Sequence, residues 1–83
     1  MIPDPIETTI LALVTARGAA KSICPSEVAR ALKPDGWQSL MTPVRQAAIR
    51  LSVAGQIDIL RKGKPVGPDA VHGVIRLRLR ADE

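Results

Sequence analysis

The stretch TPVRQAAIRLSVAG, residues 42–55, has the clearest helical pattern in the chain. Thr42 can cap a helix by accepting hydrogen bonds from free backbone N–H groups, and Pro43 suits the first helical position, where no donor is needed. Gly55 favours the end of the helix. The apolar positions recur at i, i+3, i+4 and i+7, and they are Val44, Ala47, Ala48, Leu51 and Ala54. We therefore expect one face of this helix to lie on a core.

Two alternating apolar and polar segments follow this helix. Residues 56–62 and 74–80 each alternate in this way, which predicts two β-strands. Between them, residues 63–73 form a long loop rich in glycine and proline. A helix, a strand, a loop and a strand form the second half of a winged helix-turn-helix, in which this loop is the wing. Such a loop is either functional or a flexible connection without a partner.

The first part of the chain predicts two more helices. Asp4 and Glu7 fit a capping box around Pro5, and the helix that they begin should end near Gly18. Its inward side chains are Ile6, Ile10, Leu13 and Val14. Residues 21–24 are a candidate for a short first strand, and residues 25–32 for a second helix with Val28, Ala31 and Leu32 inward. Residues 33–36 then form a turn, and residues 37–41 an extra helical turn.

These elements together predict one α+β domain over residues 1–83. We expect a winged helix-turn-helix with three main helices and a small two- to three-stranded antiparallel sheet. The core should be aliphatic, because hydrophobic residues make up 46% of the chain while Trp37 is its single aromatic. Without Phe or Tyr, the stacking surface of common single-strand binders is missing. We expect Trp37 to fill a gap in the core rather than to stack on a base.

Positive charge is concentrated in the second half of the chain. Residues 1–44 carry four basic and four acidic residues, whereas residues 45–80 carry eight basic against two acidic residues, a net charge of +6. The acidic pair Asp82 and Glu83 brings the total to +4. The helix of residues 42–55 and the hairpin are therefore the basic part, which suits contact with a phosphate backbone. The alternative is a solvated face that keeps a small protein from associating.

The sequence gives little indication of an enzyme active site. One cysteine, Cys24, and one histidine, His72, cannot supply a tetrahedral metal site. Cys24 is either a small buried hydrophobe or a reactive thiol, and His72 is most simply a solvated loop residue. No glycine-rich phosphate loop follows a strand. We expect no catalytic activity, no cofactor, no metal and no small-molecule substrate.

The location expected from the sequence is the cytoplasm. A lone cysteine cannot form an internal disulfide, which suits a reducing compartment. The chain starts Met-Ile-Pro-Asp without a basic segment, and its longest apolar run, residues 10–14, is short. Neither a signal peptide nor a membrane span is expected, and so no membrane partner.

Double-stranded DNA is the first candidate partner. The first turns of a recognition helix enter the major groove, and basic residues in the wing and last strand neutralise flanking phosphates. Arg45 is the strongest candidate, since a guanidinium can pair bidentately with guanine or a phosphate. The predicted DNA contacts are Gln38, Ser39, Thr42, Arg45 and Gln46 on the helix side, and Lys62, Lys64, Arg76 and Arg78 on the hairpin. A small transcriptional regulator would use such a site.

A protein partner or a homodimer is the alternative. On the helical wheel Ile49 and Val53 fall nearly opposite the apolar stripe of residues 42–55, where a groove-facing helix normally carries polar side chains. An exposed apolar pair there would suit a protein contact. The other explanation is that Trp37 and its helical turn cover both side chains.

Two resemblances accompany these patterns. The segments PSEVA, residues 25–29, and VRQAAIRL, residues 44–51, followed by Gly55, resemble the DNA-binding half of GntR-type bacterial regulators. That resemblance implies that Arg45 matches the DNA-contacting arginine of those proteins.

Over nearly its whole length the chain is similar to the small bacterial domain-of-unknown-function family 3253. The segments KSICPSEVAR, KGKPV and GVIRLR, at residues 21–30, 62–66 and 73–78, carry this resemblance together with Trp37, Leu40 and Met41. It implies a winged-helix-like fold and a bacterial origin, and it brings no established activity or binding residues.

Overall fold

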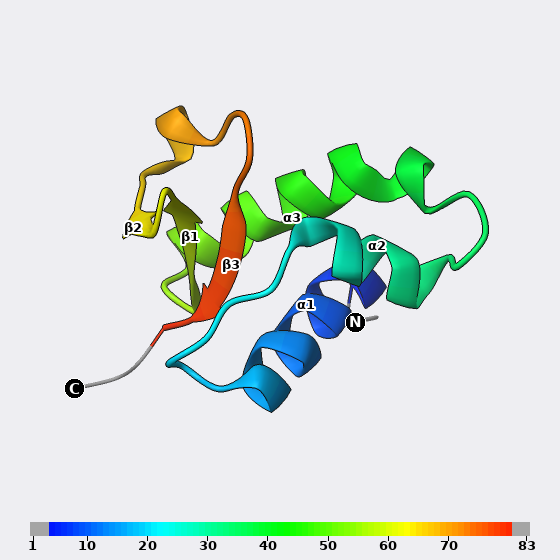
Figure 1. The fold of residues 1–83 in the computed structure, drawn as a ribbon, viewed down its shortest axis with the longest axis horizontal. Coiled ribbons are helices and arrows are strands. Elements are labelled where there is room, and N and C mark those ends of the chain that lie inside the picture. Colours follow the sequence, from blue (N-terminus) through cyan, green and yellow to red (C-terminus); the bar gives the residue numbers. More distant parts are fainter. Residues whose placement is uncertain (1–3, 81–83) are drawn as a thin grey trace.

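The computed structural model describes residues 4–80, so that residues 1–3 and 81–83, the latter including the acidic pair Asp82 and Glu83, lie outside the described residues. The helices are α1 (Pro5–Arg17), α2 (Pro25–Leu32) and α3 (Met41–Val53), and two short 3-10 helices span Trp37–Leu40 and Pro68–Ala70. The strands are β1 (Ile57–Arg61), β2 (Lys64–Pro65) and β3 (Arg76–Leu79). The three helices pack on one another, and the sheet stands at one end of them (Figure 1). This arrangement confirms the predicted α+β winged-helix-like fold.

The predicted starts of α1 and α2 are confirmed. Asp4 Oδ1 accepts hydrogen bonds from the backbone N–H groups of Ile6 at 2.8 Å and Glu7 at 3.4 Å. Pro25 starts α2, and Glu27 Oε2 accepts a hydrogen bond from the backbone N–H of Cys24 at 2.8 Å. Each helix thus begins at a proline whose missing donor costs nothing in the first turn.

The inward face of α2 differs from the prediction. Ala31 is exposed, whereas Pro25, Val28 and Ala29 are buried. Leu32 is half-buried against the core. Ala29 rather than Ala31 therefore lies on the inward face of α2.

The start of α3 also differs from the prediction. Thr42 does not cap the helix: the 3-10 turn of Trp37–Leu40 runs directly into α3, and Thr42 is exposed within its first turn. Pro43 is tolerated there, because the first four N–H groups of a helix lack an acceptor within the helix. At the other end, Ala54 follows the helix and is exposed, while Gly55 takes a positive φ of 82°.

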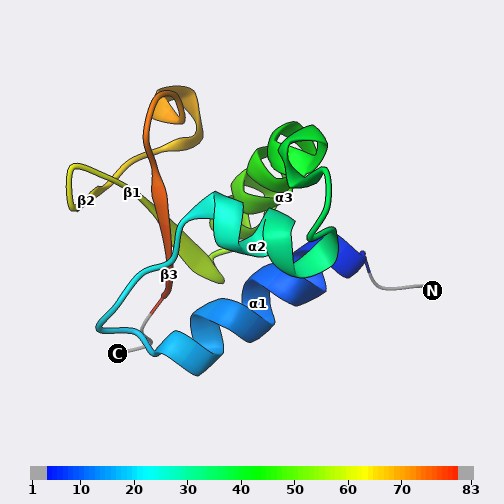
Figure 2. The ribbon, with the colours of Figure 1, turned by 45° about the vertical axis from the view of Figure 1, so that its right-hand side comes forward.

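One hydrophobic core joins the helices to the sheet. The buried core side chains come from all three α-helices, from both longer strands and from Ile23 and Ile75, and α1 and α3 contact the sheet. The predicted stripe of α3 is confirmed for four of its five positions, Val44, Ala47, Ala48 and Leu51. Figure 2 shows α3 seen nearly along its axis above α2 and α1, with the sheet beside all three.

The sheet has the order β2-β1-β3 and is antiparallel. On the far side of β3, Ile23 and Leu77 exchange two backbone hydrogen bonds of 2.8 Å each. The short first strand expected at residues 21–24 is therefore reduced to a single bridge. It still ties the α1–α2 connection to the sheet.

The predicted wing is more ordered than a plain loop. After β1 the chain turns at Lys62 and Gly63, whose φ angles are 53° and 79°, and continues as β2. Two consecutive positive φ angles are the conformation of a tight type I′ hairpin turn. The backbone N–H of Val66 then donates to the carbonyl of Ile59 at 2.9 Å, and the 3-10 helix Pro68–Ala70 contacts α3. The wing therefore has two parts, the β1–β2 turn and the loop from β2 to β3.

Candidate nucleic-acid interface

The first turns of α3 present polar side chains to solvent. Gln38, Ser39, Thr42 and Gln46, all predicted DNA contacts, are exposed. Ser39 Oγ donates a hydrogen bond to the carbonyl of Gly36 at 2.9 Å, which fixes the turn before α3. In Figure 1 the start of α3 and the Pro68–Ala70 segment both rise along the upper edge of the molecule. A ligand lying along this edge would meet both.

Arg45 lies between α3 and the wing. Its Nη2 donates a hydrogen bond to the carbonyl of Gly73 at 2.8 Å, and its side chain is half-buried. The contact spans 28 positions in sequence and holds the loop before β3 against the helix. A guanidinium has five N–H donors, so this bond leaves donors for a phosphate or a base.

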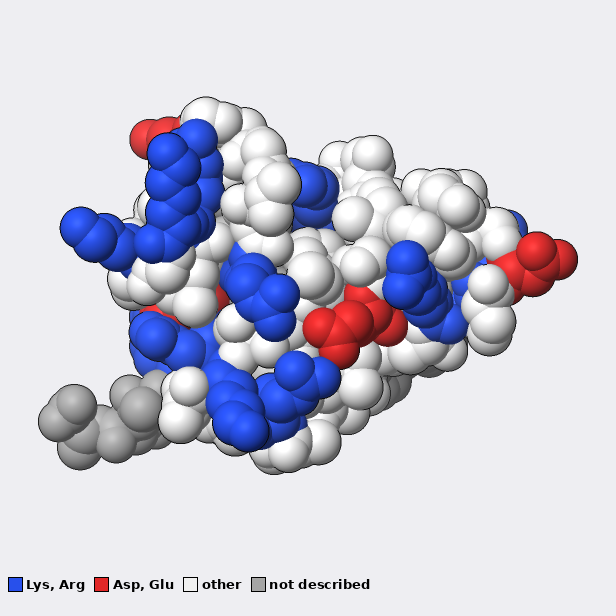
Figure 3. Space-filling view, viewed as in Figure 1, with Lys and Arg blue, Asp and Glu red and all other residues white. Residues whose placement is uncertain are grey.

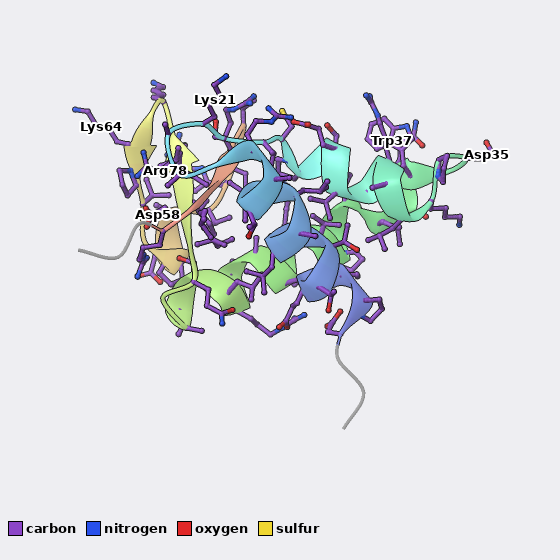
Figure 4. All side chains as sticks on the ribbon, turned by 90° about the horizontal axis from the view of Figure 1, so that it is seen from below. Lys21, Asp35, Trp37, Asp58, Lys64 and Arg78 are labelled. Atoms are coloured by element: carbon purple, nitrogen blue, oxygen red, sulfur yellow. The ribbon has the colours of Figure 1, made fainter. Side chains whose placement is uncertain are left out.

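The β1–β2 turn carries exposed cations. Lys62 and Lys64 are exposed, and neither forms an ion pair within residues 4–80. Figure 4 shows Lys64 projecting away from the end of the hairpin. In Figure 3, Lys and Arg side chains gather over the sheet end of the molecule. The charge of Lys62 and Lys64 is therefore accessible to solvent and to an anionic partner.

Arg76 is held by the α1–α2 connection. Its Nε donates to Ser22 Oγ at 2.6 Å, its Nη2 to the carbonyl of Ser22 at 2.9 Å, and its Nη1 to Cys24 Sγ at 3.3 Å. These bonds fix the orientation of the guanidinium without neutralising its charge. Arg76 thus remains a cation whose position is set by residues 52 and 54 positions earlier in the chain.

Arg78 belongs to a charge cluster with Asp58 and Arg80. Asp58 Oδ2 accepts from Arg78 at 3.0 Å, and Oδ1 accepts from Arg80 at 2.9 Å (Figure 4). Burial disfavours the charged carboxylate, but the hydrogen bonds and charges of the two arginines outweigh it and lower the pKa of Asp58. One carboxylate therefore neutralises part of the charge that the sequence assigns to the last strand.

Arg50 forms a second ion-paired group. It bonds to Glu7 Oε2 at 2.7 Å and to Asp4 Oδ2 at 3.0 Å, which joins α3 to the start of α1. The hydrogen bond that Arg50 donates to Glu7 is the main cause that raises the pKa of Arg50. Three of the eight basic residues in the +6 segment, Arg50, Arg78 and Arg80, are thus paired with carboxylates. The unpaired charge of residues 45–80 lies on Arg45 and on the hairpin.

Ile49 and Val53, the apolar pair expected to be either exposed or covered, differ in their burial. Ile49 is half-buried and packs against the core, whereas Val53 is 70% exposed. Trp37 also packs against the core, and the guanidinium of Arg30 lies 4.4 Å from the centre of its ring. That stacking occupies one face of the indole. Only Val53 of the two remains as an exposed apolar side chain on α3.

Groups for metal binding are not assembled in the described part of the chain. Within residues 4–80 no three His, Cys, Asp or Glu side chains lie close enough to hold a metal ion. His72 is exposed in the loop before β3, and Cys24 is half-buried with a free thiol. Among the described helices, none has the length and apolar character needed to cross a bilayer.

Comparison with known proteins gives one family. A search of curated proteins finds no match. The family model described as Protein of unknown function (DUF3253) matches residues 3–80. The match covers nearly all of the chain, and so the chain belongs to the DUF3253 family.

Proposed function

We propose that this protein binds double-stranded DNA as a bare winged-helix module, the type of module that a small transcriptional regulator uses. The observation that carries the proposal is the joint position of α3 and the wing. Exposed polar side chains start α3, the wing loop lies along the same edge, and Arg45 connects them. A recognition helix flanked by a wing is the arrangement that reads a groove and grips the adjacent backbone.

The proposed contacts fall into two groups. Thr42, Gln46 and the remaining donors of Arg45 would reach base edges or phosphates from α3, and Gln38 and Ser39 would do so from the 3-10 turn before it. Lys62 and Lys64 would neutralise backbone phosphates, since no carboxylate of residues 4–80 pairs with them. Arg76 keeps its charge and can assist, whereas a phosphate contact by Arg78 would compete with Asp58. We also propose a bacterial origin. We propose a cytoplasmic location as well, because a single cysteine suits a reducing compartment.

Binding to random duplex DNA should weaken steeply with salt. We expect micromolar affinity by fluorescence anisotropy at low salt, because the unpaired cations release counterions from the duplex. Lys62→Gln and Lys64→Gln should each reduce the slope of log K against log salt by about 0.9, the value for one phosphate contact. Lys21→Gln, which removes an exposed cation from the α1–α2 connection, serves as the matched control and should leave the slope unchanged. Absence of binding at low salt would refute the proposal.

Arg45→Ala tests the contribution of α3 separately from the hairpin. We expect it to weaken DNA binding by about tenfold, the equivalent of one charge-assisted contact. Arg45→Lys keeps the charge and one donor for Gly73, and so it should recover part of the affinity. Equal affinities of the wild type and Arg45→Ala, measured with both proteins folded by circular dichroism, would remove α3 from the interface.

A protein-interaction module remains the second candidate, and one observation favours it. Val53, near the end of α3, exposes 70% of its surface. A single exposed valine is common on monomers, so this support is weaker than that of the polar helix start and the wing. Sedimentation of wild type and Val53→Ser separates the two: self-association lost in the variant would favour the protein contact.

A further inference from the structure

A pocket opens on the face of the sheet that points away from the core. Its volume is about 300 Å³, and the residues that line it are Ser22, Leu60, Lys62, Gly63, Val74 and Arg76. Three segments meet there: the α1–α2 connection, the β1–β2 turn and the start of β3. Leu60 and Arg76 are directly paired across β1 and β3, so their side chains share one face. The size suits a small molecule.

The pocket has an apolar side. Two apolar residues line it: Leu60, which is only 7% exposed, and Val74, which is 84% exposed. Among the described residues, Val74 is one of two large hydrophobic side chains with such exposure. An apolar group placed against Leu60 and Val74 would remove this surface from water, which stabilises a complex.

The two cations that line the pocket, Lys62 and Arg76, have no carboxylate partner within residues 4–80. The guanidinium of Arg76 is oriented by Ser22 and Cys24, neither of which carries a carboxylate. Lys62 also has no ion pair within the described part of the chain. Further along the same face, Asp58 neutralises two arginines. The sheet face thus has a neutralised end and an end with two unpaired cations around an apolar pocket.

The β1–β2 turn holds Lys62 at this pocket in a strained conformation. Its φ of 53° lies in the left-handed region, which is unfavourable for a residue with a Cβ. Asparagine or glycine would fit the turn better. Strain of this kind persists where a particular side chain is needed at a particular place.

We propose that this pocket binds a small organic anion, a carboxylate or phosphate group attached to a compact apolar body. The charged group lies between the Lys62 ammonium and the free donors of Arg76, and the body lies on Leu60 and Val74. The proposal concerns binding alone, and no covalent step on the ligand is proposed. The site does not depend on DNA binding, and the tests use the protein without DNA.

The experiment is an NMR titration of the ¹⁵N-labelled chain with four probes. Benzoate and phenyl phosphate should each produce saturable shifts of the amides of residues 61–63 and 74–76. Benzyl alcohol has the apolar body without the charge, and inorganic phosphate has the charge without the body, so both should bind at least about fivefold more weakly. Binding of either control as tight as that of its organic anion would overturn the proposal, as would shifts that do not saturate.

Variants locate the site. Lys62→Gln should weaken binding of the organic anions by about five- to tenfold through loss of one charged contact. Val74→Ser should weaken it by about threefold through loss of apolar contact. Lys64→Gln removes the same charge two residues away, outside the pocket lining, and should leave the affinity unchanged. Equal losses in Lys62→Gln and Lys64→Gln would show a diffuse charge effect and overturn the site.

Discussion

Leu77→Ala is expected to lower the free energy of unfolding by about 3 kcal/mol, within the 2–5 kcal/mol typical of a buried leucine. Leu77 is fully buried on β3, opposite Ile59 on β1 and bridged to Ile23 on the other side. A cavity there would loosen contacts of the sheet with α1 as well. Since small domains have a total stability of about 5–15 kcal/mol, urea unfolding followed by circular dichroism should show a large shift.

Leu79→Ala is the matched control for this prediction. It removes the same atoms from the same strand and the same face, but Leu79 is only half-buried. Its cost should therefore be less than half that of Leu77→Ala. Equal costs for the two variants would contradict the assignment of Leu77 to the centre of the core.

Asp58→Asn is expected to lower the free energy of unfolding at pH 7 by about 1–2 kcal/mol. The side chain of Asp58 is 15% exposed and accepts hydrogen bonds from two arginines, whereas asparagine has no charge to offset theirs. The expected loss of unfolding free energy is not larger, because solvent screens the charges of Arg78 and Arg80, which are 32% and 42% exposed. Asp69→Asn, in an exposed turn, should change stability little, and equal effects of both variants would contradict the prediction.

The contribution of Asp58 should depend on pH in one direction. Its pKa is lower in the folded protein than in the unfolded chain, because the two arginines stabilise the carboxylate. The stabilisation is therefore complete above the unfolded value of about 3.9 and is lost as pH falls through the folded pKa. The difference in stability between wild type and Asp58→Asn should be constant from about pH 5 to 8 and shrink below about pH 4. A difference that grew on acidification would contradict this assignment.

The bounds of α1 and α2 could be predicted because local residues fix them. Asp4 and Pro5 begin α1, and Gly18 ends it with a φ of 89°. Pro25 begins α2, and the hydrogen bond from the backbone N–H of Cys24 to Glu27 is local in sequence. The start of α3 was predicted wrongly for the opposite reason. Thr42 has the chemistry of a cap, but the turn of Trp37–Leu40 packs against the core and extends the helical path upstream of it.

The charge pattern of the candidate interface could be predicted only in part. The sequence shows that basic residues gather on α3 and the hairpin, but not which of them are paired. Pairing of Asp58 with Arg78 follows from the register of β1 against β3, which alternation alone does not specify. The one feature of the sequence that indicates this ion pairing is the presence of Asp58 in a strand that pairs with a strand of alternating arginines. The bond from Arg45 to Gly73 depends on how the wing folds over α3, and no local pattern indicates it.

The edges of the sheet have a consequence for how this protein behaves when it is concentrated. The outermost strand, β2, consists of Lys64 and Pro65 alone. Proline offers no N–H to a strand from another molecule, and a lysine beside it opposes close approach of a second copy. At the opposite edge, the bridge from Ile23 already occupies the outward backbone groups of Leu77. Both edges of the sheet are thus poor templates for strand addition, so the sheet is protected against edge-to-edge aggregation.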